Sequence, residues 1–251
     1  MLPHILPLIP RHTIYTECFA GGLAVFFAKE KAKTEIINDI NAFIPNFYNM
    51  LVNDFDNLKK KIDGTPYSRA MYKVALVMYK TPHLFNDLQK GWAFFILTNQ
   101  GFSGQIGSFG CYSLGTKSAW WVKQKKLLTP ELKERFDGVQ IECTDALNIL
   151  KLRDKEGLSF HFIDPPYFNS DCGHYGNYTE KDFKDLLELL STMKGKFLLS
   201  SYPSDILSEY TKMNGWTTKI IEAKVSASHT KDGKQKKKYE VLTYNYTFEN
   251  E

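Results

Sequence analysis

The 251-residue chain lacks the features that mark membrane, secreted and metal-binding proteins. No stretch approaches the ~20 consecutive apolar residues needed to span a bilayer. Its four cysteines show no Cys-x-x-Cys spacing and no secretory segment beside them, and its six histidines have no metal-ligand spacing. These absences predict a cytoplasmic protein with reduced thiols and without a metal site.

A large excess of one charge is also missing. The chain has 32 Lys and Arg against 28 Asp and Glu, which gives a net charge of +4. This modest basic excess permits a polyanionic partner without requiring one. With 43% hydrophobic residues the chain has enough apolar content for a sizeable core, as one large domain or as a domain with an insertion. We expect it to fold alone, and a monomer is the simplest expectation.

The most informative stretch is Asp164-Pro165-Pro166-Tyr167, which follows the apolar run 159–163. Each proline fixes its own φ and restricts the residue before it, so the turn is rigid before any ligand binds. The prolines lack an N–H, and the site therefore consists of acceptors beside the aromatic ring of Tyr167. Such a site suits an amino group on a planar ring. The alternative is an ordinary proline turn at the end of a strand.

A glycine turn stands upstream of this motif. The β-rich segment 13–18 leads into Phe19-Ala20-Gly21-Gly22-Leu23, and the apolar helix 24–28 follows. A strand, a glycine turn and a helix N-terminus are typical of a nucleoside site, because glycines let a ligand approach the backbone. A second short strand, 35–39, ends in an acid that could bind a ribose. Only two adjacent glycines are present, which disfavours a nicotinamide cofactor.

Short strands alternate with helices along most of the chain, as in a parallel sheet covered on both faces. The later strands are predicted at 139–143, 160–163, 197–202, 216–225 and 241–248, the last two as an antiparallel hairpin. Between about 53 and 138 only helical patterns appear, which predicts an inserted helical subdomain. One of its helices is expected at 68–79, with Met71, Val74, Ala75 and Met78 facing inward. Thr179 and Asp182 predict a capping box at the start of a later helix.

The segment 98–110 of the insertion is rich in Gly and Ser and contains aromatic residues, and lysines follow it. Its amides could read base edges, and the lysines could meet phosphates. The alternative is a mobile surface loop followed by a solvated basic strip. A second basic segment, 226–239, is usually a solvated tip but would contact the backbone in a DNA enzyme.

Taken in order, Cys18 to Leu23, Asn38-Asp39 and Asp164 to Tyr167 resemble the Dam-like (α) class of S-adenosylmethionine-dependent DNA adenine methyltransferases. The resemblance covers most of the chain. It implies an α/β fold with a seven-stranded Rossmann-like methyltransferase sheet and an inserted helical target-recognition subdomain. The catalytic domain would comprise residues 1–52 and 139–251, and the DNA-recognition subdomain residues 53–138.

The resemblance also implies roles for individual residues. Asp164, Pro165, Pro166 and Tyr167 would be catalytic. The cofactor S-adenosylmethionine would be bound by Glu17, Phe19, Ala20, Gly21, Asp39, Asp145 and Asp164, with Asp39 at its ribose and Asp145 at its adenine. Double-stranded DNA would be bound by Gln100, Phe102, Ser103, Gln105, Lys123, Lys125, Lys126 and Lys236.

Two departures from the family pattern stand out. Ala146 occupies a position where relatives often have an aromatic residue, so weaker stacking on the cofactor adenine is expected. Relatives usually carry a Tyr-x-Gly-Gly-Lys segment before a helix like 2–8, and the sequence printed here starts at Met1 without it. A weaker hold on the methionine end of the cofactor is therefore expected.

The chemistry that the resemblance implies is methylation of an adenine amino group, as in DNA methylation and restriction–modification. Asp164 and the Pro165 carbonyl would each accept an amine hydrogen and aim the nitrogen lone pair at the methyl sulfonium. The base would flip out of the duplex and stack on Tyr167. Two alternatives stay open: an rRNA base methyltransferase, and a non-catalytic DNA-binding protein that resembles a methyltransferase.

Overall fold

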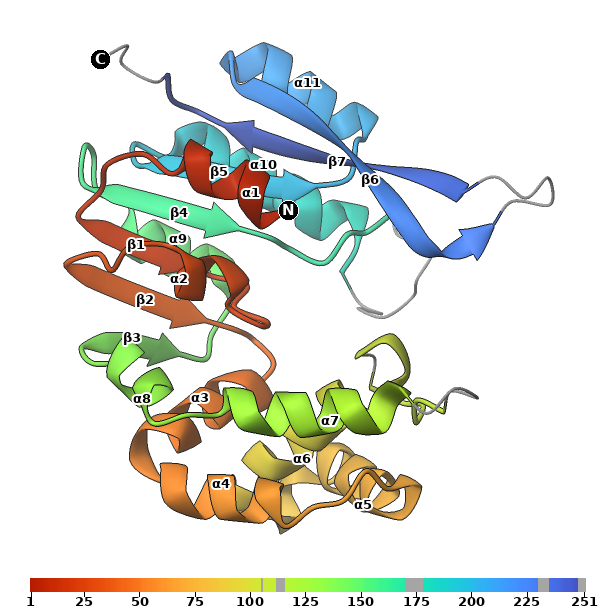
Figure 1. Cartoon of the computed structure of the whole chain (residues 1–251). Helices are drawn as coiled ribbons and strands as arrows, with labels where there is room; N and C mark the ends of the chain where they lie inside the picture. The colour runs from red at the N-terminus through yellow and green to blue at the C-terminus, as the bar shows by residue number, and fades with distance from the viewer. Residues whose placement is uncertain (105, 112–115, 170–177, 230–234, 248–251) are drawn as a thin grey trace. The chain divides into compact units, whose positions relative to one another are not determined.

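The computed structural model describes residues 1–104, 106–111, 116–169, 178–229 and 235–247 (Figure 1). A seven-stranded sheet has the strand order β3-β2-β1-β4-β5-β7-β6. Its strands are β1 (Ile14–Glu17), β2 (Thr34–Asn38), β3 (Val139–Glu142), β4 (Ser159–Ile163), β5 (Lys196–Ser201), β6 (Thr217–His229) and β7 (Gln235–Tyr244). The helices among the described residues are α1 (Leu2–Ile5), η1 (Leu6–Leu8), α2 (Ala24–Ala28), α3 (Phe43–Asn53), α4 (Phe55–Asp63), α5 (Arg69–Lys80), η2 (Pro82–Leu84), α6 (Asp87–Gln100), η3 (Phe102–Gly104), α7 (Thr116–Leu127), α8 (Glu131–Arg135), α9 (Ala146–Arg153), α10 (Glu180–Thr192) and α11 (Asp205–Asn214).

The direction of the strands fixes where functional groups meet. β1 pairs in parallel with β2 and β4, and β4 pairs in parallel with β5. β7 runs antiparallel to both β5 and β6. The predicted seven-stranded, Rossmann-like α/β sheet with a C-terminal hairpin is thereby confirmed. Parallel pairing brings the carboxyl ends of β1, β4 and β5 to one edge, where open α/β sheets bind ligands.

The chain divides into two compact units, Met1–Asn38 with Thr144–Glu251, and Asp39–Cys143. In the first unit, one face of the sheet is covered by α9, α10 and α11. α10 contributes Phe183, Leu186, Leu187 and Leu190 to this core. Its repeat of apolar residues at helical spacing explains this burial, and the predicted Thr179/Asp182 capping box is present. β4 is buried along its whole length, which explains its continuous apolar run.

The second unit is helical over most of its length. α6, which begins with an Asn86/Gln89 capping box, contacts α3, α4, α5 and α7. Thr65 joins two buried indoles: its hydroxyl accepts from Trp92 Nε1 at 2.8 Å and its carbonyl accepts from Trp121 Nε1 at 3.0 Å. The helices of this unit therefore pack around an aromatic core with satisfied polar groups.

Two expectations for this unit need correction. Val74, predicted to face inward on α5, is 45% exposed, whereas Tyr72 is buried. The lysine-rich segment after the Gly/Ser-rich loop, where no individual helix was predicted, forms α7. Its only buried side chain among residues 117–127 is Trp121. Because α7 buries a single side chain in this range, its sequence shows no apolar residues repeating at helical spacing, and that repeat is the signal by which a helix is predicted.

Candidate active site

The Asp164-Pro165-Pro166-Tyr167 motif follows β4 directly. The Tyr167 hydroxyl donates to Asp164 Oδ1 at 2.9 Å and lies 3.0 Å from Ser200 Oγ at the end of β5. Because β4 and β5 are parallel neighbours, the strand after the motif supplies Ser200 to the same edge. The predicted catalytic residues Asp164 and Tyr167 thus lie in direct contact.

Asp164 is at once accessible and desolvated. Solvent reaches its side chain, yet the protein packed around it withholds enough water to raise the pKa of the carboxyl to about 6. Hydrogen bonds from Tyr167 and Ser200 lower this pKa, and the charge of Glu240 raises it. At pH 7 to 8 the carboxyl is therefore ionised and accepts hydrogen bonds.

Tyr167 is held at both its ring and its hydroxyl. Its ring centroid lies 4.2 Å from that of Tyr202, with the planes tilted by 54°. Desolvation and the Asp164 charge raise the pKa of the Tyr167 hydroxyl well above its usual value, so it stays neutral and donates. Sequence reasoning missed Ser200 and Tyr202. The signal available was their place at the end of the strand predicted next after the motif.

The glycine turn from Phe19 to Leu23 adopts backbone conformations that only some residues allow. Gly21 has φ +46°, and among the described non-glycine residues Leu23 alone has a positive φ, +54°. A Cβ built on Gly21 or Gly22 would meet nothing within 4 Å. The turn therefore needs glycine at 21 for its φ, and open space lies beside both glycines. Ala20 is buried, and its N–H donates to the Asn38 carbonyl at 2.9 Å.

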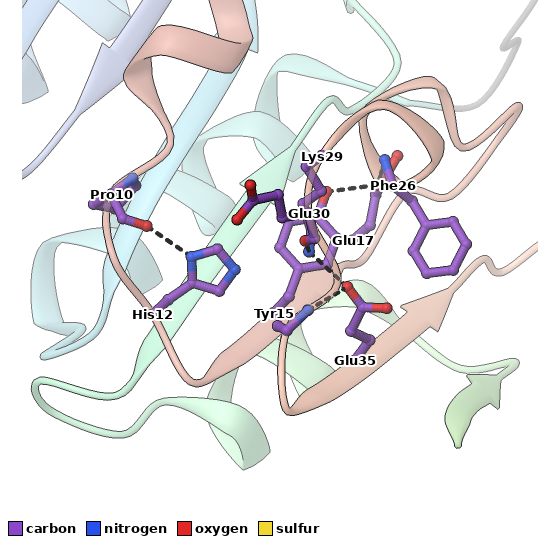
Figure 2. Close-up of polar contacts among 9 residues, drawn as sticks. Pro10, His12, Tyr15, Glu17, Phe26, Lys29, Glu30 and Glu35 are labelled. Carbon is purple, nitrogen blue, oxygen red and sulfur yellow. Dashed lines mark hydrogen bonds and ion pairs between the residues drawn. The ribbon is translucent and has the colours of Figure 1, made fainter. Parts of the chain in front are cut away.

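Glu17, predicted to bind the cofactor, is turned into the fold (Figure 2). Its carboxyl is buried, accepts from the Tyr15 hydroxyl at 2.6 Å and accepts from the Phe26 N–H at 3.1 Å. Burial raises the pKa of Glu17 to about 8, although both hydrogen bonds lower it. At neutral pH the carboxyl is thus largely protonated, and its contacts fix the strand and α2 on either side of the turn.

Phe19 packs edge-on against Tyr178, with ring centroids 6.2 Å apart. Asp145 is exposed, and its Oδ1 caps α9 by accepting from the Leu147 N–H at 2.8 Å. Asp39 follows β2, is half-buried, and accepts from the Asn41 N–H at 2.9 Å. Ala146, one of the two departures from the family pattern, is the first residue of α9 and is buried in the core.

Asn38 also belongs to this part of the chain, and sequence reasoning gave it no role of its own. Its buried amide donates to the carbonyls of Cys18 and Thr144, both at 3.0 Å. Its oxygen accepts from the Thr144 N–H at 2.9 Å. One side chain thus ties the ends of β1 and β2 to the backbone just before α9.

The predicted DNA-binding residues differ in how they are placed. Gln100 is buried, donates to the Pro66 carbonyl at 3.0 Å and accepts from the Ser68 N–H at 3.1 Å. Both ends of its amide are engaged inside the fold, so in this arrangement the predicted reading of a base edge does not hold for Gln100. Phe102 is 46% exposed. Gln105 and the side chain of Ser103 lie outside the described residues.

The lysines differ as well. Lys123 and Lys126 on α7 are exposed. Lys125 donates instead to the Asp63 carbonyl at 3.0 Å and the Thr65 carbonyl at 3.4 Å, at the C-terminal end of α4. The side chain of Lys236 lies outside the described residues, although β7 itself is placed.

Two features are absent from the described residues. No group of three or more His, Cys, Asp or Glu side chains there could hold a metal ion. No helix in the described ranges is long and apolar enough to cross a membrane.

Comparison with known families and structures gives the following matches. The family described as D12 class N6 adenine-specific DNA methyltransferase matches residues 1–228. A precorrin-6y C5,15-methyltransferase from Geobacter metallireducens has a TM-score of 0.36 and 9% identity, over 94% of this chain and 81% of its own. A precorrin-8w decarboxylase from Methanobacterium thermoautotrophicum has a TM-score of 0.40 and 10% identity, over 98% and 88%. An Entamoeba histolytica methyltransferase has a TM-score of 0.34 and 13% identity, over 96% of this chain and 56% of its own. These three scores are too low to bear on function.

Proposed function

Because the chain belongs to the D12 class N6 adenine-specific DNA methyltransferase family, we propose that it transfers a methyl group from S-adenosylmethionine to the 6-amino group of adenine in double-stranded DNA. The observation that carries this proposal is the Asp164–Tyr167 contact at the carboxyl end of β4. It sets an ionised acceptor beside an aromatic ring, which is the arrangement that a planar aminated base requires.

The exocyclic amine of adenine is a poor nucleophile, because its lone pair is delocalised into the ring. An ionised Asp164 accepts one amine hydrogen, and the Pro165 carbonyl accepts the other. The nitrogen is thereby drawn toward tetrahedral geometry, and the carboxylate stabilises the positive charge that develops on it. The Tyr167 hydroxyl occupies part of the carboxylate's acceptor capacity, and an ionised carboxylate has about four lone-pair sites in all.

The residues around the glycine turn fit an S-adenosylmethionine site. Open space lies beside Gly21 and Gly22, so backbone can approach a ligand there. Asp145 is exposed and offers acceptor capacity beyond its cap. We assign Phe19 and Gly21 to the pocket wall, Asp145 to the adenine and Asp39 to the ribose. When bound, S-adenosylmethionine supplies an electrophilic methyl group on a sulfonium.

The target adenine must leave the duplex to reach Asp164, which costs a few kcal/mol of unstacking. Stacking on the Tyr167 ring offsets part of this cost, and Tyr202 keeps that ring in place. We propose that the unit Asp39–Cys143 binds the flanking DNA, with exposed Phe102, Lys123 and Lys126 as contacts. We also propose DNA contacts by Ser103 and Gln105, which lie in the Gly/Ser-rich segment, and by Lys236, which lies in the basic segment 226–239.

The experiment that tests the function is transfer of labelled methyl from S-adenosylmethionine to unmethylated duplex DNA, followed by digestion to identify the modified base. Label on N6 of adenine is expected. Label on RNA in a parallel reaction would replace the proposal by an RNA methyltransferase. No label on either, with no cofactor binding by calorimetry, would favour a non-catalytic DNA-binding protein.

Asp164→Asn tests the mechanism, because it keeps the shape and the acceptor for Tyr167 but removes the charge. Transfer is expected to fall by at least ~100-fold, as for other groups that stabilise developing charge. Asp205→Ala, an exposed aspartate in the first turn of α11, is the control and should leave transfer unchanged. Asp164→Asn at wild-type rate, with an unchanged circular dichroism spectrum, would contradict the mechanism.

A further inference from the structure

A chain of buried contacts links Glu35 on β2, Lys29 after α2, and Tyr15 and Glu17 on β1 (Figure 2). It begins at the ion pair between Lys29 and Glu35, whose side chains are 3% and 1% exposed and whose charged atoms are 2.5 Å apart. Lys29 also donates to the Glu30 carbonyl at 2.8 Å, and Glu35 accepts from the Ala32 N–H at 3.0 Å. The hydrogen bonds of this pair hold the connection from α2 to β2.

Tyr15 links this pair to Glu17. Tyr15 and Glu35 are register partners on parallel strands, so their side chains lie on the same face of the sheet. The Lys29 ammonium lies 4.0 Å from the centroid of the Tyr15 ring. The Tyr15 hydroxyl then donates to Glu17 at 2.6 Å. The contact chain therefore runs from Glu35 through Lys29 and Tyr15 to the carboxyl at the end of β1.

A buried ion pair is weak support for stability, because desolvation offsets most of the attraction. Its place in the fold offers another role. We propose that Tyr15 and the Lys29–Glu35 pair are positioning residues for cofactor binding, which hold the Glu17 carboxyl and through it the glycine turn. This inference rests on the proposed function, because it takes S-adenosylmethionine as the ligand of that turn.

The route from Glu17 to the turn is the N-terminus of α2. The N-cap residue of this helix is Leu23, which provides no side-chain cap. The Glu17 carboxyl accepts from the Phe26 N–H in its place, at 3.1 Å. The glycine turn therefore connects two elements that Glu17 holds together: Glu17 is the last residue of β1, and its carboxyl caps α2. If Glu17 loses the hydrogen bond from Tyr15, its carboxyl holds the end of β1 and the start of α2 less firmly. The backbone of the turn between them, including the φ of +46° at Gly21, is then less well fixed.

Charge adds a second effect. The titratable groups that act on Glu17 are Tyr15 on β1, Lys29 after α2 and Asp164 after β4. Tyr15 and Lys29 lower the pKa of Glu17, and Asp164 raises it. S-adenosylmethionine carries a positive sulfonium, so an ionised Glu17 behind the turn favours its binding. Loss of the Tyr15 hydroxyl or of the Lys29 charge moves the ionisation of Glu17 to higher pH.

The test is calorimetric titration of the full chain with S-adenosylmethionine between pH 6 and 9.5. Tyr15→Phe removes one hydroxyl and keeps the ring. We expect its affinity at pH 7.5 to fall about fivefold, as loss of one hydrogen bond to a largely neutral carboxyl predicts. The pH at which binding reaches half its maximum should rise. The cofactor's own titration is the same in every variant, so it cancels in the comparison.

Two more variants complete the design. Lys29→Met with Glu35→Gln removes both charges without leaving one of them unpaired, and the pH of half-maximal binding should again rise. Tyr210→Phe is the matched control, because Tyr210 is a buried tyrosine on α11 whose hydroxyl contacts the Glu188 carboxylate at 3.4 Å. It should leave both affinity and pH profile unchanged.

The outcomes separate this inference from the proposed function. Wild-type protein that binds no S-adenosylmethionine overturns both. Wild-type protein that binds it, with Tyr15→Phe at the same affinity and pH profile, overturns only the positioning role. Should Tyr15→Phe fail to fold, the double variant decides: an unchanged pH profile there overturns the role as well.

Discussion

In the proposed mechanism the Asp164 carboxyl stabilises the charge that develops on the amine nitrogen, which requires the carboxyl to be ionised. Its pKa of about 6 places the change of charge within reach of experiment. We predict that the rate of methyl transfer falls as the pH is lowered through about 6. In Ser200→Ala the midpoint should shift upward, because Ser200 lowers this pKa. The measurement is kcat against pH for both proteins.

Ser208→Ala, at an exposed serine of α11, is the control for this profile and should reproduce the wild-type midpoint. A Ser200→Ala profile that coincides with wild type would mean that Ser200 does not act on the carboxyl.

Glu17 gives a second prediction, on stability. Its pKa is raised to about 8, so the folded state binds this proton more tightly than the unfolded chain does. Stability should therefore fall as pH rises from the unfolded value, about 4.3, through about 8, by on the order of a few kcal/mol in total. Glu17→Gln removes the titration. Melting temperatures at pH 6, 7, 8 and 9 should decline less steeply in this variant than in wild type, and parallel declines would refute the assignment.

At the scale of single residues, the sequence predicted contacts between residues that are close together in the chain. Asp164 and Tyr167 are three residues apart and follow an apolar run, so their contact could be anticipated. Ser200 and Asn38 act on partners 33 and 106 residues away, through pairing that no local pattern shows. Gln100 was misjudged because an amide in a Gly/Ser-rich segment looks exposed, and only the fold buries it.

Among the elements, α7 separates two neighbouring lysines. Lys123 is exposed, whereas Lys125 donates to the carbonyls of Asp63 and Thr65 at the C-terminal end of α4. We predict that Lys123→Ala weakens binding of duplex DNA and reduces the slope of log affinity against log salt by about 1. Lys125→Ala should leave that slope unchanged and lower the free energy of unfolding instead. Fluorescence anisotropy at several salt concentrations and urea unfolding measure the two effects.

Lys212→Ala, at an exposed position of α11, is the control for a loss of positive charge elsewhere. Equal salt slopes for Lys123→Ala and Lys212→Ala would argue against a phosphate contact by α7.

β4 and β5 were predictable because each is a compact apolar run. β7 begins at Gln235, well before its predicted start at 241, because its first four residues are polar and show no strand pattern. α7 was missed because it buries Trp121 but exposes Trp120, Val122 and Leu127, so its apolar residues follow no helical repeat. On α5, Val74 was misassigned and the buried Tyr72 was overlooked for a related reason. Periodicity indicates that a helix has a buried face, but the neighbouring α6 decides which flank of that face is covered.

At the scale of the whole molecule, the chain leaves the first unit after Asn38 and returns to it at Thr144. The Asn38 side chain bonds to Thr144 through both its amide ends. We predict that Asn38→Ala lowers the free energy of unfolding by about 2 to 4 kcal/mol, because buried carbonyls and an N–H lose their partner. Urea unfolding followed by circular dichroism measures this change.

Asn38→Asp should destabilise as well, since a carboxylate cannot donate to the Cys18 and Thr144 carbonyls. Asn148→Ala, at an exposed position of α9, is the control and should change stability by less than about 0.5 kcal/mol. An Asn38→Ala protein as stable as this control would show that the bonds to Thr144 contribute little.

The Asn38 bridge bears on how such a chain can be re-engineered. Because Asn38 is bonded to Thr144, the segment Asp39–Cys143 leaves and re-enters the first unit at points that are held together, so it forms a closed loop. Closing a loop costs entropy that grows only slowly with its length. A replacement that keeps β3 (Val139–Glu142), and changes only the helical segment before it, could then differ in size and surface at little expense to the sheet. The proposed DNA-contact surface could be exchanged in this way without rebuilding the Asp164–Tyr167 contact.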